Sequence, residues 1–233
     1  MLFDGVFIPE SLIEFNGNTS YQYDYFSTYI SERILALYKT SQQHKALAND
    51  KVADYSKFLT NEHIKDWLEL RDSLGIMHNM FLCAVGDVGI TTDLRNAMLA
   101  QVFEPLYSFL AKRVKKGKLQ FKKCGNETSK KTKLPFAYRL AELIDKYGDN
   151  IFKHEIDNGK KDSLVIGIKN NRNRMFHVEK DNIGLTAEQC AGYNEKLSLL
   201  YRQIILLLLG VNISDEMAVL AKKLEKTYPG CFL

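Results

Sequence analysis

The chain has 233 residues, of which 45% are hydrophobic and 26% are charged, and its formal net charge at pH 7 is +4. This length suits one large domain or two small ones, and the composition is typical of a globular protein that buries a core. Only four prolines are present, which argues against an all-β fold with its many turns.

The cysteines and the N-terminal sequence predict a protein of a reducing compartment. The four cysteines are not spaced as metal-binding pairs, and a chain of this size does not depend on disulfides. Residues 1–9 lack the basic start and apolar run of a signal peptide. The most apolar stretch, residues 204–209, is too short to span a bilayer. We therefore expect a cytoplasmic protein without a membrane segment.

In chain order, residues 1–60 are predicted to form an N-terminal extension with one long helix. Pro9 and the sequence Asn16-Gly17-Asn18 make the first twenty residues irregular. Apolar residues then recur at helical spacing, which predicts a helix over residues 20–49. Tyrosines crowd the beginning of this helix, and we interpret them as packing residues rather than as a surface that stacks on bases.

Residues 61–233 are predicted to form one helical domain, so the fold class is an all-α bundle. Apolar periodicity and capping residues indicate the helices, with Pro105 as a kink and Gly210 as a stop. The expected ranges are 61–85, 92–115, 136–151, 164–178, 186–209 and 214–226.

The basic residues are concentrated in one segment of the chain. Ten Lys or Arg residues and one acidic residue, Glu127, lie between Lys112 and Lys133, which gives a local charge of +9. Residues 116–133 are predicted to form a loop. Such a loop attracts phosphate backbones by counterion release, but a solvated loop kept soluble by lysine has the same composition. Both interpretations remain open.

The segment from Asn170 to His177 carries the chemistry of the chain. Its first five residues are polar and three of them are asparagine, which suits a helix interior poorly. Two guanidinium groups, an amide and an imidazole suit a phosphate ligand and proton transfer. A capped helix end with solvated arginines is the alternative. The sequence has no phosphate-loop, dinucleotide or zinc-protease motif, so no cofactor or metal is expected.

Spacing along a helix constrains how these side chains meet. Asn173 and His177 are four residues apart and share a face. Arg172 and His177 are five apart, roughly 140° around the axis, so they diverge on a straight helix. Either the asparagine-rich stretch breaks the helix and turns Arg172 inward, or a second copy of the chain completes the site.

Arg172-Asn173-x-x-x-His177 resembles the Arg-x(4–6)-His signature of the HEPN superfamily (higher eukaryotes and prokaryotes nucleotide-binding domains), in the version with a polar residue after the arginine. The helical context is also similar, because an amphipathic helix precedes the motif helix and a long apolar helix follows it. The resemblance covers about the C-terminal two-thirds of the chain.

The resemblance implies a metal-independent endoribonuclease that acts as a homodimer in antiviral defence, a toxin–antitoxin pair or RNA processing. His177 would be the general acid or base, Arg172 would stabilise charge on the phosphate, and Asn173 would orient His177 or the phosphate. We add Arg174 as a substrate contact outside the family pattern. We also add the lysines of the basic segment as contacts to the RNA backbone: Lys115, Lys116, Lys118, Lys122, Lys123, Lys130 and Lys131.

Two other functions remain open at this point. The chain could be a catalytically silent member of the superfamily that binds RNA, a nucleotide or a partner protein through Arg172 and His177. It could also be a structural or regulatory helical dimer with residues 197–209 as the interface. An antitoxin or other regulatory protein is a further expected partner.

Overall fold

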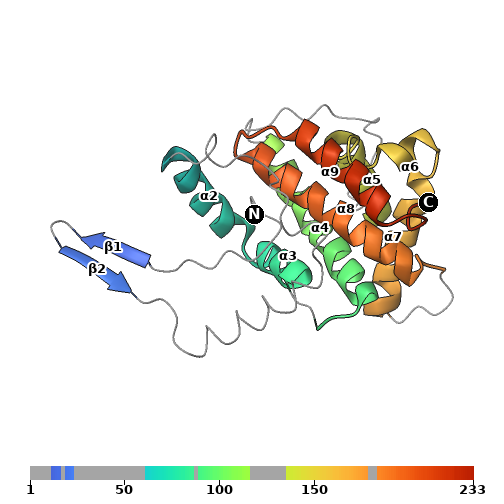
Figure 1. Cartoon of the computed structure of the whole chain (residues 1–233), viewed down its shortest axis with the longest axis horizontal. Helices are drawn as coiled ribbons and strands as arrows, with labels where there is room; N and C mark the ends of the chain where they lie inside the picture. Colours follow the sequence, from blue (N-terminus) through green and yellow to red (C-terminus); the bar gives the residue numbers. More distant parts are fainter. Residues whose placement is uncertain (1–11, 17–18, 24–60, 87–88, 116–134, 178–182) are drawn as a thin grey trace.

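The structure is a computed structural model that describes residues 12–16, 19–23, 61–86, 89–115, 135–177 and 183–233. Apart from one two-stranded hairpin, the elements in these ranges are helices (Figure 1), and the all-α prediction is confirmed. In this part of the chain no helix is long and apolar enough to cross a membrane.

The hairpin consists of strands β1 (Leu12–Asn16) and β2 (Thr19–Tyr23), which pair antiparallel with Asn16 opposite Thr19. The helix predicted from residue 20 is therefore wrong at its beginning. The two residues between the strands are Gly17 and Asn18, a dipeptide that is typical of hairpin turns, and tyrosines at alternate positions favour a strand. The rest of the predicted helix, residues 24–49, lies outside the described residues.

Helices α2 (Asn61–Leu74) and α3 (Ile76–Gly86) replace the single helix predicted over residues 61–85. They are separated by Gly75, whose φ of 53° is left-handed. Only glycine adopts this conformation without steric cost. The backbone N–H of Gly75 still donates to the carbonyl of Arg71 at 3.0 Å, so the chain leaves one helix and starts the next within one residue.

Helix α4 (Thr92–Lys115) has the predicted bounds and continues through Pro105, which is exposed. Thr91 caps its first turn, because its hydroxyl accepts a hydrogen bond from the N–H of Leu94 at 3.3 Å. The predicted basic loop after α4 lies outside the described residues, as do all of its lysines.

Helix α5 (Phe136–Tyr147) ends earlier than predicted, and a short unpredicted helix, α6 (Lys153–Asp157), follows it. A side chain at Gly148 would place its Cβ 2.8 Å from a methyl group of Leu200, so glycine allows close packing there. Ile151 continues the apolar stripe and is fully buried, although it lies beyond the end of α5.

The last three helices are α7 (Lys161–His177), α8 (Ala187–Leu208) and α9 (Ser214–Thr227). Helix α8 begins next to its predicted start, because Thr186 and Gln189 form a reciprocal capping box. The predicted stop is confirmed, since Gly210 has a φ of 78° just beyond the end of α8.

Helix α4 lies at the centre of the bundle. It packs on α3, α5, α7 and α8, while α8 also packs on α5 and α9 (Figure 1). Phe81, Phe103 and Tyr201 are at most 1% exposed in this core, and burying each such side chain contributes about 1.5–3 kcal/mol. The side chains of α4 that face α7 therefore decide what surrounds the predicted motif.

Candidate functional site

The whole motif lies on α7, which remains helical from Lys161 to His177. The asparagine-rich stretch thus does not break the helix, and one of the two geometric solutions suggested by the sequence is wrong. Arg172 and His177 stay five residues apart on a regular helix, roughly 140° around its axis. His177 is the last residue of α7, and its side chain lies outside the described part of the chain.

Arg172 points into the contact between α7, α4 and α5. Its Nε donates to Oε1 of Gln101 at 2.6 Å, and its Nη2 donates to Oε2 of Glu104 at 2.6 Å. The guanidinium carbon lies 4.6 Å from the centre of the Phe136 ring, which adds a cation–π contact. With its side chain only 13% exposed, Arg172 is held in one orientation rather than solvated.

Glu104 joins Arg172 to a second arginine. Nη1 of Arg139 lies 3.5 Å from Oε1 of Glu104, and the Arg139 guanidinium carbon lies 5.6 Å from the centre of the Tyr107 ring. The Tyr107 hydroxyl donates to Oε2 of Glu142 at 2.6 Å. Burial and this hydrogen bond raise the pKa of Tyr107 above its ordinary value. The polar groups of α4 and α5 therefore form a continuous cluster beside the motif.

Gln101, Glu104 and Arg139 were not among the residues predicted from the sequence. Gln101 and Glu104 lie three apart on α4, which places them on one face of the helix. The sequence does not show that this pair of polar residues faces Arg172.

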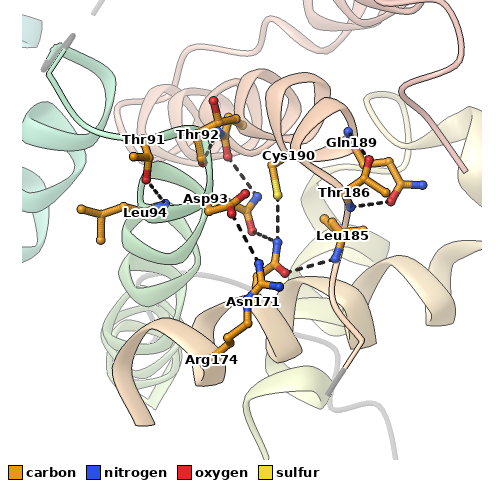
Figure 2. Close-up of polar contacts among 12 residues, drawn as sticks. Thr91, Thr92, Asp93, Leu94, Asn171, Arg174, Leu185, Thr186, Gln189 and Cys190 are labelled. Carbon is orange, nitrogen blue, oxygen red and sulfur yellow. Dashed lines mark hydrogen bonds and ion pairs between the residues drawn. The ribbon is translucent and has the colours of Figure 1, made fainter. Parts of the chain in front are cut away.

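Asn171 is fully buried and connects three helices (Figure 2). Its amide nitrogen donates to Sγ of Cys190 on α8 at 2.8 Å and, at 3.4 Å, to the side-chain oxygen of Asn96 on α4. Its oxygen accepts from the backbone N–H of Leu185 at 3.1 Å. Asn96 extends this hydrogen-bond network, because its Nδ2 donates to Oδ1 of Asn194 at 2.9 Å. These bonds satisfy polar groups that would otherwise be costly to bury.

Arg174 points toward the beginning of α4 (Figure 2), where its Nη2 lies 3.4 Å from Oδ2 of Asp93. The two carboxylates that hold the arginines, Asp93 and Glu104, are eleven residues apart on α4, roughly 16 Å along its axis. The prediction that both guanidiniums hold one phosphate therefore finds no support within one chain, because the structure does not bring Arg172 and Arg174 together.

The other asparagines of the motif have different surroundings. Asn170 donates to the backbone carbonyl of Ile183 at 2.8 Å, which ties α7 to the segment before α8. Asn173 is half-buried, and the helical period places position 177 on its face. Ile166 and Phe176 belong to the same side of α7 and are 53% and 46% exposed. This face thus presents apolar side chains on either side of Asn173.

The predicted lysine contacts are only partly located. Lys115 is the last residue of α4, eleven residues beyond Glu104, or roughly 16 Å along the helix. The remaining lysine candidates lie outside the described residues: Lys116, Lys118, Lys122, Lys123, Lys130 and Lys131. Their distance from the motif is therefore untested.

No protein-family model matches the chain, and neither a curated protein nor a solved structure matches it significantly. The resemblance to the HEPN superfamily consequently depends on the motif and on the helices around it.

Proposed function

We propose that the chain is a metal-independent endoribonuclease of HEPN type. The observation that carries this proposal is the position of Arg172. Its guanidinium is held by Gln101, Glu104 and Phe136 on an unbroken helix that also carries Asn173 and His177. A fixed guanidinium stabilises negative charge that develops on a phosphate without reorganising first.

The reaction is a transesterification within the RNA. The 2′-oxygen attacks the adjacent phosphorus while the bond from phosphorus to the 5′-oxygen breaks. His177 accepts the proton of the 2′-hydroxyl while a water molecule protonates the leaving 5′-oxygen, or His177 protonates the leaving 5′-oxygen while a water molecule accepts the 2′-hydroxyl proton. Arg172 stabilises the charge on the phosphoryl oxygens, and Asn173 orients His177 or the phosphate. The products carry a 2′,3′-cyclic phosphate and a free 5′-hydroxyl.

A homodimer completes the site in this proposal. Arg172 is directed toward α4 and α5, whereas position 177 falls about 140° away around α7. The exposed side of α7 carries Ile166 and Phe176, and a pair of such faces supplies an apolar contact between two copies. Across a two-fold axis, His177 of one copy then approaches the motif of the other.

The RNA backbone is the substrate that the basic segment fits. Lys115 and the lysines of residues 116–133 would bring the RNA to the motif with strong salt dependence. Deletion of residues 118–131 is expected to weaken RNA binding and to flatten the salt dependence of the affinity. If the affinity and the slope of its salt dependence are unchanged, the basic segment does not bind the RNA.

We propose that the protein is a cytoplasmic toxin or defence nuclease that an antitoxin or another regulatory protein holds inactive.

The deciding experiment is cleavage of a structured RNA by purified full-length protein in excess EDTA. Arg172→Ala is expected to lower kcat by about 100-fold or more, and His177→Ala by about 100- to 10,000-fold. Arg71→Ala and His154→Ala are matched controls, because both side chains are exposed and far from the motif in the sequence. Cleavage by both motif variants at the wild-type rate would refute the proposal, as would inactivity of the wild type.

Mixing the two inactive variants tests the dimer. If each site combines Arg172 of one copy with His177 of the other, a mixed dimer keeps one intact site, and about a quarter of wild-type activity returns. If both residues act within one copy, mixing restores nothing. A strictly monomeric solution mass would also refute the dimeric arrangement.

A second candidate is a catalytically silent RNA- or nucleotide-binding dimer. One observation favours it: Arg172 and Arg174 are each paired with a carboxylate, Glu104 and Asp93. A paired guanidinium has less charge to offer a reacting phosphate. In this case RNA binds without being cleaved, and Arg172→Ala changes the affinity alone.

A further inference from the structure

Glu104 contacts Arg172 but has no role in the proposed reaction. Its two carboxylate oxygens face two different arginines, with Oε2 at 2.6 Å from Nη2 of Arg172 and Oε1 at 3.5 Å from Nη1 of Arg139. The side chains of Glu104, Arg172 and Arg139 are 18%, 13% and 7% exposed. Three charged groups thus share a site from which most water is excluded.

Burial makes the carboxylate necessary for the arginine position. A guanidinium taken out of water without a partner costs several kcal/mol, so an unpaired Arg172 would turn toward solvent. Gln101 supplies an acceptor for Nε but no charge. Glu104 is therefore the group that keeps Arg172 beside α4 and α5.

Arg172 and Arg139 share the one carboxylate of Glu104. These three side chains together therefore carry a net charge of +1. The bonds to Gln101 and Glu104 use two of the five N–H donors of Arg172. In the proposed reaction the phosphate meets donors of Arg172 other than these two. The contact consequently fixes one edge of the guanidinium without neutralising the site.

We propose that Glu104 is a positioning residue that holds the Arg172 guanidinium by one edge and directs its remaining donors to the RNA phosphate. This inference rests on the proposed ribonuclease function. It assigns Glu104 no contact with the substrate. Glu104 acts through Arg172 alone. Its loss therefore weakens stabilisation of the transition state more than it weakens RNA binding.

Kinetics of Glu104→Gln test this role, because glutamine keeps the size and an acceptor oxygen but loses the charge. We expect kcat to fall about 10- to 100-fold through misplacement of Arg172, with KM changed less than about threefold. Glu142→Gln is the matched control. Glu142 lies in the same α4–α5 contact but accepts from Tyr107, and its kcat is expected to stay within about twofold of wild type. An unchanged kcat in folded Glu104→Gln would overturn the inference.

Glu104→Asp is a second variant, which keeps the inference testable if Glu104→Gln fails to fold. It keeps the charge on a shorter side chain, so it is expected to retain more of kcat than Glu104→Gln. The reverse order would show that the charge does not position Arg172. Melting curves of both variants separate a loss of folded protein from a loss of kcat.

A measurement that needs no activity distinguishes failure of this inference from failure of the proposed function. The ¹H–¹⁵N signal of the Arg172 Nε–H group, identified by its loss in Arg172→Lys, is expected to be protected from exchange in the wild type. It should lose protection in Glu104→Gln but not in Glu142→Gln. If the wild type cleaves no RNA, the ribonuclease proposal fails. An unchanged signal in Glu104→Gln would instead refute the positioning role.

Discussion

The side-chain oxygen of Asn171 accepts a hydrogen bond from the backbone N–H of Leu185 at 3.1 Å, which ties the last turns of α7 to the segment leading into α8 (Figure 2). The bond lies in the core, where a lost partner leaves a polar group without water. Gly184 precedes Leu185, and a Cβ added at Gly184 would overlap the Asn171 oxygen. The buried position of the Asn171 amide therefore depends on Gly184, thirteen residues further along the chain.

Gly184→Ala is expected to destabilise the protein by about 1–3 kcal/mol, because the new methyl group displaces Asn171. Asn171→Ala alone should cost about 1–3 kcal/mol through the unpaired N–H of Leu185. The double variant should be more stable than the sum of the two losses predicts, since each change removes the same contact. Urea denaturation of the four proteins measures the free energies of unfolding.

Gly86→Ala is the control for that cycle, because a Cβ at Gly86 meets nothing within 4 Å. It is expected to be neutral or slightly stabilising at the end of α3. Additive losses in the double variant would show that Gly184 and Asn171 do not share a contact.

Cys190, the thiol beside Asn171, is expected to be chemically inert in the folded protein. Burial, followed by the negative charge of Asp93, raises its pKa to about 12. At pH 8 such a thiol is ionised in roughly one molecule in ten thousand. Maleimide labelling followed by peptide mass spectrometry should therefore modify the exposed Cys83 quickly and Cys190 only in denaturant. Equal labelling of both in native buffer would contradict the buried environment of Cys190.

Helix bounds were predictable from the sequence where a local signal and the apolar pattern agree. Thr91 as a cap, Thr186 in a capping box and Gly210 as a stop all act within one turn, and α4, α8 and α9 accordingly have nearly the predicted ranges. The break at Gly75 was missed because a glycine inside an apolar pattern is also tolerated in a helix. The hairpin of β1 and β2 could not be predicted with certainty, because crowded tyrosines are compatible with a packed helix as well as with a strand.

The partners of the motif could not be predicted from the sequence. Asn171 and Arg172 are neighbours in the chain, yet the first is buried against α8 and the second reaches α4 and α5. The packing of α7 against the neighbouring helices determines this difference, and the local sequence pattern does not indicate it. Glu104 in particular precedes a proline on a long helix, so nothing near it in sequence indicates an arginine 68 positions away.

His78 is expected to make the stability of the fold depend on pH. It is buried among Trp67, Phe81 and Tyr201, and its Nδ1 lies 3.1 Å from the Tyr201 hydroxyl. Burial, with a smaller contribution from the charge of Arg71, lowers the pKa of His78 below its ordinary value of 6.5. The imidazole is thus neutral in the folded state at pH values where the unfolded chain already binds a proton.

The sign follows from linkage: above about pH 6.5 both states are neutral and His78 contributes no pH dependence. As the pH falls below 6.5, the unfolded state gains the proton first, and stability decreases by up to about 1.4 kcal/mol per pH unit until the folded pKa is reached. Urea denaturation at pH 7.5 and 5.5 should show this loss in the wild type and in His154→Gln, whose side chain is exposed. His78→Gln should show less of it, and an equal loss in all three would assign the pH dependence to other groups.

Lys196 carries a buried charge whose partners are unequal in exposure. Its Nζ lies 2.8 and 2.9 Å from the two carboxylate oxygens of Glu155 and 2.9 Å from Oε1 of Glu225. It also lies 4.4 Å from the centre of the Phe232 ring near the C-terminus. Lys196 and Glu155 are fully buried, whereas the Glu225 side chain is 27% exposed. Loss of the lysine therefore leaves Glu155 as an unpaired charge in the core.

We expect Lys196→Met to destabilise the protein by about 3–5 kcal/mol, because the buried Glu155 loses its counter-charge. Glu225→Gln should cost about 1 kcal/mol or less, since solvent reaches Glu225 and Glu155 still neutralises the lysine. Lys196→Met combined with Glu155→Gln should recover part of the loss, because neither side chain then carries a charge. Chemical denaturation at pH 7 measures all three. If Lys196→Met cost no more than Glu225→Gln, the lysine would have to be solvated in the folded protein, and the C-terminal residues around Phe232 would not cover it.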